Sequence, residues 1–238
     1  MPRRGCGRTR QTGEVLRGVL FDWRGTLVAD PPDEWWISKA IERLGRDIEE
    51  VAGLVDALDR TSRNDEVAQA LRSADCSASE HRQATMLWFR TAGLDDDLAA
   101  VLYDLDLEAE HHPFFPDVAD TLHALRRRGV ATAVVSDIHF DLRPEFAAAG
   151  LEGLIDLFVL SFEHGMQKPD PEIFRIAAHA LALDPPELLM VGDRASHDGG
   201  AVALGITTLL LPSLPTAAQP RGLATVLSLL DGSHRANA

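Results

Sequence analysis

Four polar segments of this chain each follow an apolar run, and their residue types suit chemistry on a charged substrate. The segments carry Asp22, Ser136, Lys168 and Asp193, and Asp22 comes directly after the apolar residues 19–21. In an open α/β sheet, ligands bind outside the carboxyl ends of the strands. If the segments end neighbouring strands, carboxylates, a hydroxyl and an ammonium group meet at one edge of the sheet.

Each segment also has a purely structural interpretation. Asp22 could belong to a turn, Ser136 could cap the next helix, and Lys168 could lie in a surface loop. The chain has 23 cationic residues, of which only Lys39 and Lys168 are lysines. Because lysine is so rare in this chain, Lys168 in such a segment favours a functional interpretation, whereas Lys39 fits a solvent-exposed helix face. The common order of the four segments therefore favours one site.

The elements that must position these residues fall into two patterns. Between residues 33 and 106, apolar residues recur at helical spacing, which predicts four helices. After Pro113, strands and helices alternate. Strands are expected at 130–135, 157–160, 188–191 and 206–211, and helices at 118–128, 141–149, 170–183 and 198–204. Repeated βα units predict an α/β fold, a Rossmann-like parallel sheet with helices on both faces.

The helical residues interrupt the α/β pattern, so they form an insertion. We expect an α/β core from residues 14–30 and 108–238, a helical cap from 31–107, and a disordered tail at 1–13. Both linkers of the cap lie beside the strand that precedes Asp22, which is the geometry of a lid. Trp35 and Trp36 are expected in the core of the cap. His111 and His112 lie in the return linker, where a metal site is not expected.

Composition narrows the possible partners. The 238 residues carry a net charge of −14, which argues against a nucleic-acid partner because phosphate binding needs clustered Lys and Arg. No run reaches the roughly 18 apolar residues of a membrane helix. The basic residues near the start are not followed by an apolar segment, so they do not form a secretory signal. Cys6 and Cys76 give no disulfide framework, and we expect a cytoplasmic protein.

The order of the motifs resembles that of the haloacid dehalogenase (HAD) superfamily. Asp22 opens Asp-Trp-Arg-Gly-Thr, Ser136 and Lys168 follow, and Gly192-Asp193 precedes a second aspartate, Asp198. The resemblance covers about residues 15–212, and the inserted helices are similar to the C1 cap of that superfamily. It implies a hydrolase that forms a covalent intermediate on the first aspartate.

The resemblance also implies a magnesium site. Asp22 is the expected nucleophile, which forms an aspartyl-phosphate. Mg²⁺ is expected on the carboxylates of Asp22 and Asp193 and on the backbone carbonyl of Arg24, with Asp198 holding metal-bound water. Metal binding then does not depend on the Arg24 side chain.

The remaining motif residues are expected to bind the phosphoryl group. Lys168 neutralises charge on the nucleophile and the phosphate, and Ser136 donates a hydrogen bond to a phosphoryl oxygen. Gly25 and Thr26 contribute backbone N–H groups after the nucleophile, and Asp137 belongs to the same substrate-binding set. These are the electrostatic contributions that dominate phosphoryl transfer.

Arg24 stands where the superfamily usually has its general acid. Acid–base groups contribute roughly 10²–10⁴-fold, and a guanidinium with a pKa above about 12 cannot take that role. Four interpretations stay open. In the first, the leaving group needs no proton, and in the second, another side chain supplies the proton, from Glu163, His164 or His139. In the third, Arg24 binds an anionic group of the substrate or pairs with a motif carboxylate. In the fourth, the protein binds its ligand without turnover.

We therefore predict a Mg²⁺-dependent phosphatase, a monomer or homodimer, acting on a small phosphorylated metabolite. The alternatives are a catalytically impaired binding protein and a hydrolase of phosphonates or haloacids. Haloacid dehalogenases also lack the second aspartate, but they typically replace the Gly-Asp that this chain keeps at Asp193. Phosphonatases have a similar first motif and use a cap lysine. Lys39 lies too soon after Asp22 for that role, and these enzymes carry Arg at the Lys168 position.

Overall fold

The computed structural model describes residues 15–47, 51–108, 111–212, 214 and 216–236. The tail predicted to be disordered, residues 1–13, lies outside the described residues. Five parallel strands form one sheet in the order β3-β2-β1-β4-β5. The strands are β1 (Gly18–Phe21), β2 (Ala131–Ser136), β3 (Leu157–Leu160), β4 (Leu188–Gly192) and β5 (Thr207–Leu210). The predicted α/β, Rossmann-like class is confirmed.

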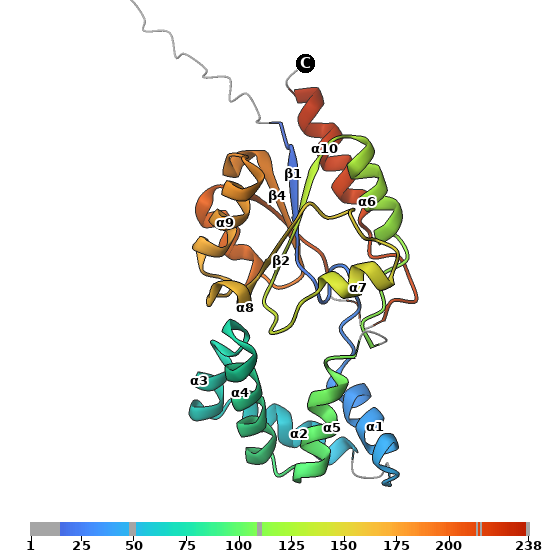
Figure 1. Cartoon of the computed structure of the whole chain (residues 1–238), viewed down its shortest axis with the longest axis vertical. Coiled ribbons are helices and arrows are strands. Elements are labelled where there is room, and N and C mark those ends of the chain that lie inside the picture. The colour runs from blue at the N-terminus through green and yellow to red at the C-terminus, as the bar shows by residue number, and fades with distance from the viewer. Residues whose placement is uncertain (1–14, 48–50, 109–110, 213, 215, 237–238) are drawn as a thin grey trace, which may run out of the picture.

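Helices cover both faces of the sheet (Figure 1). Alternate residues of a strand point to opposite faces, so Val19 and Phe21 pack into one apolar cluster and Leu20 into the other. The first cluster includes residues of α6 (Val118–Arg127), α7 (Arg143–Ala148) and α10 (Ala224–Ala236). The second includes residues of α9 (Pro171–Leu181) and η5 (Asp198–Leu204).

Some of these elements differ from the sequence-based expectation. The helix expected at 198–204 has these bounds but is a 3₁₀ helix, η5, whose first residue Asp198 is fully buried. Three elements were not expected: the short helices α8 (Ser161–His164) and η4 (Pro185–Glu187), and the last helix, α10. Among the described residues, no helix is both long and apolar enough to cross a membrane.

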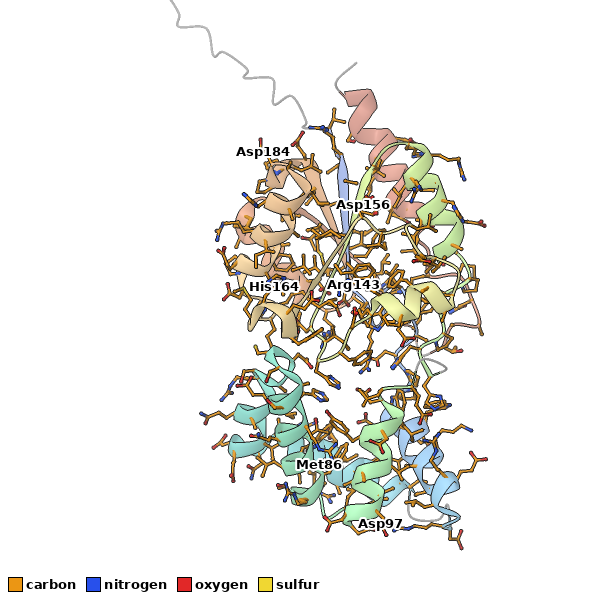
Figure 2. The ribbon with its side chains drawn as sticks, in the orientation of Figure 1. Met86, Asp97, Arg143, Asp156, His164 and Asp184 are labelled. Atoms are coloured by element: carbon orange, nitrogen blue, oxygen red, sulfur yellow. The ribbon has the colours of Figure 1, made fainter. Side chains whose placement is uncertain are left out.

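The inserted residues form a separate bundle, which we call the helical block. It comprises α1 (Asp33–Leu44), α2 (Val51–Ser62), α3 (Asp65–Leu71), η2 (Ala74–Cys76), α4 (Ala78–Thr91) and α5 (Asp96–Leu105). It has its own apolar cluster, in which Ile37 and Leu105 are fully buried. Met86 packs against this cluster, and Asp97 lies at the end of the block far from the sheet (Figure 2). Helix α3 and η2 were not expected; the Asn64 side chain caps α3 by accepting from the N–H of Glu66.

Two connections hold the helical block to the core. The first is formed by its two linkers: the N–H of Ala29 donates to Pro113, and the N–H of Phe115 donates to Leu27. The second lies far along the sequence, where the Ser161 hydroxyl is 2.6 Å from the carbonyl oxygen of Asp75 in η2. The block is therefore attached to the core on both sides of the strand ends.

Candidate active site

Parallel pairing brings the four sequence segments to one edge of the sheet. Phe21 is in register with Val134 on one side and Val191 on the other, so Asp22, at the end of β1, lies level with the ends of β2 and β4. A polar cavity of about 170 Å³ opens there. Its lining includes Asp22, Arg24, Ser136, Asp137, Asp193 and Arg194 from the core and Asp75 and His81 from the helical block.

Lys168 is the central cation of the site. Its Nζ lies 2.6 Å from Asp22 Oδ1 and 2.6 Å from Asp198 Oδ1, and the side chain is fully buried. Burial alone disfavours the ammonium, but the nearby carboxylates, Asp22 first, raise the pKa of Lys168 above its usual value. Its backbone N–H donates to Asp137 Oδ1 at 2.8 Å. Lys168 therefore stays protonated and is positioned at both its backbone and its side chain.

Asp198 organises the loop after β4. While Oδ1 accepts from Lys168, Oδ2 accepts the backbone N–H groups of Asp193 at 3.1 Å and Arg194 at 2.9 Å. Gly192 permits this contact, because a Cβ there would lie 2.1 Å from Asp198 Oδ2. Asp198 thus holds the lysine and the loop in one arrangement.

Among the buried carboxylate oxygens that have no hydrogen-bond partner in the described part of the chain, one belongs to Asp22 and one to Asp193. Asp22 Oδ2 and Asp193 Oδ1 are buried and have no partner among the described residues. Burial and the neighbouring charge of Asp22 raise the pKa of Asp193 to about 6. Carboxylate oxygens of Asp22, Asp193 and Asp198 lie within 4.8 Å of one another. Partnerless buried carboxylate oxygens facing one another fit a hard cation such as Mg²⁺, which takes oxygen ligands.

Gly25 allows Asp193 to approach the loop after Asp22. Its φ is +72°, and a Cβ would lie 2.3 Å from Asp193 Oδ2. Its carbonyl oxygen accepts from Arg221 Nε at 2.6 Å. Thr26 is fully buried, its hydroxyl has no partner among the described residues, and it is not part of the polar cavity lining. The backbone N–H groups of Gly25 and Thr26, expected to bind the phosphoryl group, instead donate within the loop, to the carbonyl oxygens of Val28 at 2.9 Å and Trp23 at 3.2 Å.

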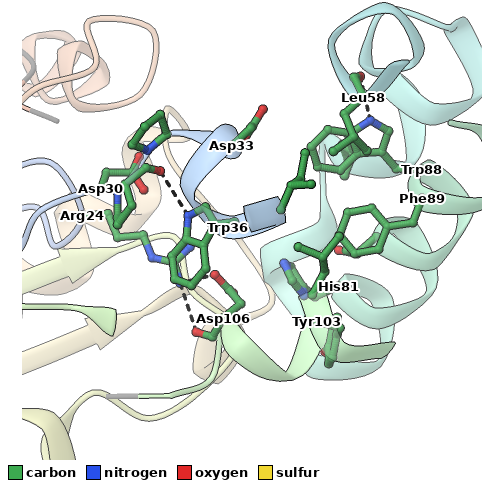
Figure 3. Close-up of a pocket in the computed structure, with 16 residues that line it drawn as sticks. Arg24, Asp30, Asp33, Trp36, Leu58, His81, Trp88, Phe89, Tyr103 and Asp106 are labelled. Carbon is green, nitrogen blue, oxygen red and sulfur yellow. Dashed lines mark hydrogen bonds and ion pairs between the residues drawn. The ribbon is translucent and has the colours of Figure 1, made fainter. Parts of the chain in front are cut away.

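Arg24 turns toward the helical block. Its Nη2 lies 2.7 Å from Oδ1 of Asp106, the residue directly after α5, and 3.4 Å from His112 Nε2. Figure 3 shows this pair beside Asp30. The partner is thus a carboxylate of the helical block, not one of the motif carboxylates considered from the sequence.

Of the three residues considered as replacement acids, His139 lines the polar cavity. Glu163 accepts two hydrogen bonds from Arg143, at 2.8 and 3.3 Å, and His164 is the last residue of α8. Neither Glu163 nor His164 lines the cavity. Burial raises the pKa of Asp137, which does line it, to about 6.

Several residues of the site were missed from the sequence. Arg221 is buried and holds the Gly25 carbonyl, yet it comes from a segment without a recognisable pattern. Arg194 lines the polar cavity, and its position beside Asp193 was a usable signal. His81 was missed because it lies on a helix of the inserted block, and the helical pattern there predicts packing contacts but no site residue.

A second, larger cavity of about 570 Å³ lies in the helical block (Figure 3). Its lining includes the aromatic side chains of Trp36, Trp88 and Phe89, and it shares Arg24, Asp30 and His81 with the polar cavity. Trp36 therefore lines this cavity and is partly buried, and it also packs against the apolar cluster of the helical block, as the sequence predicted.

Two other sequence-based expectations concern residues outside the cavities. Lys39 pairs with Glu42 at 3.0 Å on an exposed helix face, as expected. His112 is buried in the return linker, where its Nε2 lies 2.9 Å from the Asp106 carbonyl oxygen, so it serves as a packed contact of the linker.

Comparison with known proteins agrees with this geometry. The family model for haloacid dehalogenase-like hydrolases matches residues 16–205. The chain belongs to this family. The predicted superfamily is thereby confirmed, and the protein is a HAD-like hydrolase.

Among curated relatives, this HAD-like hydrolase is 30% identical over 203 residues to the glyceraldehyde 3-phosphate phosphatase of Methanopyrus kandleri, covering 82% of this chain and 83% of the relative. It is 35% identical over 117 residues to the phosphoserine phosphatase of Thermus thermophilus, covering 46% and 47%, so it spans about half the length of that relative. The L-2-haloacid dehalogenase of Xanthobacter autotrophicus has a similar fold, with a TM-score of 0.61 at 23% identity over 90% of this chain and 82% of that one.

Proposed function

We propose that this hydrolase is a Mg²⁺-dependent phosphatase that acts on a small phosphorylated metabolite with Asp22 as the nucleophile. The observation that carries the proposal is the environment of Asp22. One of its oxygens is held by Lys168, the other has no hydrogen-bond partner, and carboxylate oxygens of Asp22, Asp193 and Asp198 lie within 4.8 Å of one another. Two relatives named as phosphatases support the same class.

The described residues supply the groups that phosphoryl transfer needs. A carboxylate oxygen of Asp22 bonds to phosphorus as the bond to the leaving oxygen breaks, and water then hydrolyses the aspartyl-phosphate. Lys168 offsets negative charge at the nucleophile, and Ser136 lines the cavity where phosphoryl oxygens would lie. Mg²⁺, held by Asp22, Asp193 and the Arg24 carbonyl with Asp198 behind them, would offset charge on the phosphoryl oxygens.

The position of Arg24 limits the leaving group. In a C1-capped HAD enzyme this position usually carries the acid that protonates the leaving oxygen, and here its side chain is paired with Asp106. We propose that the substrate is an acyl or aryl phosphate, whose leaving group is stable without a proton. The larger cavity in the helical block, reached past Arg24 and His81, would receive the organic part.

The test is hydrolysis of acetyl phosphate, p-nitrophenyl phosphate and an alkyl phosphate, each with Mg²⁺ and with EDTA. We expect Mg²⁺-dependent turnover of the first two substrates alone. Arg24→Asp would face the Asp106 carboxylate, so the matched variant is Arg24→Asp with Asp106→Asn, and we expect it to hydrolyse the alkyl phosphate as well. Absence of turnover on all three would overturn the proposal.

A binding role without turnover is the second candidate, and the Arg24–Asp106 pair favours it because it leaves the acid position occupied by a cation. Phosphorylated ligands would then bind tightly and remain intact, which calorimetry with product analysis distinguishes from catalysis. For either role we propose a cytoplasmic monomer or homodimer with a small-molecule ligand. Cell fractionation and light scattering test these two points.

A further inference from the structure

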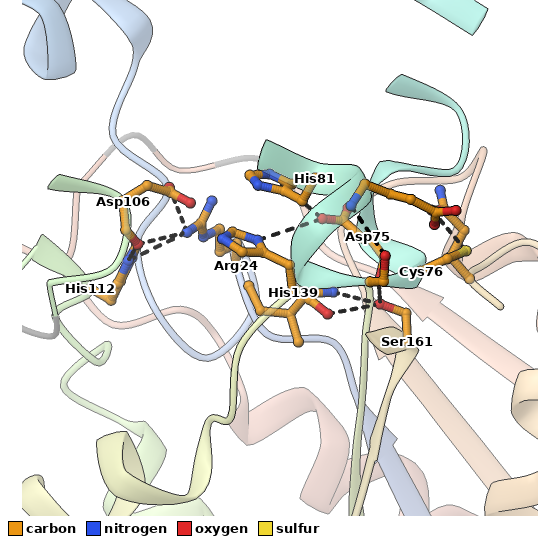
Figure 4. A network of polar contacts seen from close by, with 12 residues as sticks. Arg24, Asp75, Cys76, His81, Asp106, His112, His139 and Ser161 are labelled. Carbon is orange, nitrogen blue, oxygen red and sulfur yellow. Dashed lines mark hydrogen bonds and ion pairs between the residues drawn. The ribbon is translucent and has the colours of Figure 1, made fainter. Parts of the chain in front are cut away.

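A second cluster of polar side chains lies where the helical block meets the core (Figure 4). Asp75 belongs to η2, His81 to α4, and His139 to the loop after β2. His81 Nε2 and His139 Nδ1 each lie 3.8 Å from the same oxygen, Asp75 Oδ1. These distances are too long for hydrogen bonds, so one carboxylate oxygen lies near two imidazole nitrogens without a hydrogen bond to either.

The imidazoles lack the partners that buried polar groups normally have. His139 is 4% exposed, and neither of its ring nitrogens has a hydrogen-bond partner among the described residues. Its ring stacks on that of His81 with centroids 3.4 Å apart and planes 6° from parallel. Because buried nitrogens are nearly always satisfied, an imidazole in this condition indicates a missing partner such as water or an ion.

The backbone around the cluster holds two of its members together. Ser161 is fully buried, and its Oγ lies 2.6 Å from the carbonyl oxygen of Asp75 and accepts from the N–H of Ile138 at 2.8 Å. One hydroxyl therefore connects the backbone of Asp75, in the helical block, with that of Ile138, the core residue that precedes His139.

We propose that Asp75, His81 and His139 bind a divalent transition-metal ion of the Zn²⁺ class. One atom from each, namely Asp75 Oδ1, His81 Nε2 and His139 Nδ1, would ligate the ion. Ligand atoms of the three residues lie within 4.8 Å of one another. Bonds of about 2.0–2.2 Å would require the two stacked rings to rotate apart, because an imidazole nitrogen binds a metal in the plane of its ring. Two imidazoles and one carboxylate suit Zn²⁺ and its neighbours, whereas Mg²⁺ takes oxygen ligands.

The charge states agree with this ligand set. Burial, and then the neighbouring His139, lower the pKa of His81 to about 4. Burial would raise the pKa of Asp75, but His139, His81 and Arg24 together lower it. At neutral pH, His81 is therefore a neutral imidazole and Asp75 is a carboxylate, which are the forms that bind metals.

The site would be open on one side. Asp75, His81 and His139 all line the polar cavity that contains Asp22, so an ion can enter through that cavity. Three protein ligands leave a fourth position for water or for a substrate group. Because the ligands come from both the helical block and the core, the bound ion would also stabilise the contact between the block and the core near Asp22.

The test is titration of the full-length protein with Co²⁺ in excess Mg²⁺, read by visible absorption, followed by competition with Zn²⁺. We expect one Co²⁺ with nitrogen ligands, displaced by Zn²⁺. His81→Gln and Asp75→Asn should each weaken binding by more than about 100-fold, since even outer-shell partners of metal ligands contribute 10–100-fold. His123→Gln, on the exposed side of α6, is the matched control and should bind normally.

Two further variants separate this site from the carboxylates around Asp22. Asp193→Asn removes a carboxylate of the Mg²⁺ site and should leave the Co²⁺ spectrum unchanged. Ser161→Ala should weaken Co²⁺ binding while keeping its spectrum, because it changes the positions of the ligands and not their identity. Circular dichroism confirms that each variant is folded.

Equal Co²⁺ binding by the native protein and His81→Gln would overturn the proposal, as would loss of the spectrum in Asp193→Asn. Protection by inorganic phosphate without any binding of Co²⁺ or Zn²⁺ would also overturn it, and would assign the imidazoles to an anion. Zn²⁺ should also raise the melting temperature of the native protein, but not that of His81→Gln.

Discussion

Arg24 in the loop after β1 and Asp106 at the end of α5 form an ion pair, with 2.7 Å between Nη2 and Oδ1. Arg24 belongs to the core and precedes the helical block, whereas Asp106 directly follows the last helix of the block, so the pair joins the core to the end of the block. His112 beside them contacts both groups. The residue that departs from the superfamily pattern therefore has a local structural role, which makes the departure consistent with an intact site around Asp22.

Removing either member of this pair should destabilise the protein. Arg24→Gln and Asp106→Asn should each lower the free energy of unfolding by about 1–3 kcal/mol, because each leaves a partly buried charge without its partner. The double variant should lose less than the sum, with a coupling of about 0.5–3 kcal/mol. Urea unfolding of the four proteins measures it, and strictly additive losses would contradict the pairing.

The same pair predicts a pH dependence. Burial alone would raise the pKa of Asp106, but Arg24 and nearby histidines lower it below its usual range. Its stabilising contribution is therefore present above the unfolded pKa of about 3.9 and is lost as the pH falls through the lower folded pKa. The stability difference between the native protein and Asp106→Asn should hold from pH 7 to 5 and shrink below pH 4. A difference that grows on acidification would contradict this assignment.

The two lysines give a matched comparison. Lys168→Met leaves Asp22 and Asp198 buried without their cation, so the free energy of unfolding should fall by about 3–5 kcal/mol. Turnover should fall at least about 100-fold. Lys39→Met breaks only an exposed pair and should change stability by less than about 0.5 kcal/mol. Thermal unfolding and p-nitrophenyl phosphate turnover check both, and a Lys168→Met protein as active as Lys39→Met would exclude a role in the reaction.

Two glycines separate backbone strain from crowding of the site. Gly25 and Gly129 have φ values of +72° and +67°, but only at Gly25 would a Cβ collide with another group, Asp193 Oδ2 at 2.3 Å. Gly129→Ala should therefore lower stability by about 1–2 kcal/mol and keep its turnover. Gly25→Ala should lose more stability and most of its turnover. Equal effects of both substitutions on turnover would show that the reaction does not depend on the close contact between Asp193 and Gly25.

Local patterns made the core of this fold predictable. Strand β1 and the units after Pro113 carry buried apolar runs with turn residues between them, so sheet class and strand order in sequence could be inferred. Helix α10 was not predicted, because it follows a Pro-containing stretch. Element η5 was predicted as a helix with its observed bounds, 198–204, but its 3₁₀ type was not. Helix α3 was missed since it depends on the cap from Asn64.

The site was predictable only where chain order and parallel pairing act together. Asp22, Lys168 and Asp193 follow elements of the sheet, so their meeting was inferred. Arg221 and His81 approach the site through packing of distant segments, and no local pattern predicts such contacts. For Arg24, the sequence showed the missing acid but gave no indication that Asp106 is its partner.

The central claim is that Asp22 is the nucleophile of a Mg²⁺-dependent phosphatase. The most direct test measures p-nitrophenyl phosphate hydrolysis, with Mg²⁺ and with EDTA, by the native protein, Asp22→Asn and Asp97→Asn, the last changing an exposed aspartate at the far end of the helical block. We predict Mg²⁺-dependent turnover by the native protein and Asp97→Asn and a loss of about 10⁴-fold or more in folded Asp22→Asn. Full activity of folded Asp22→Asn would contradict the account.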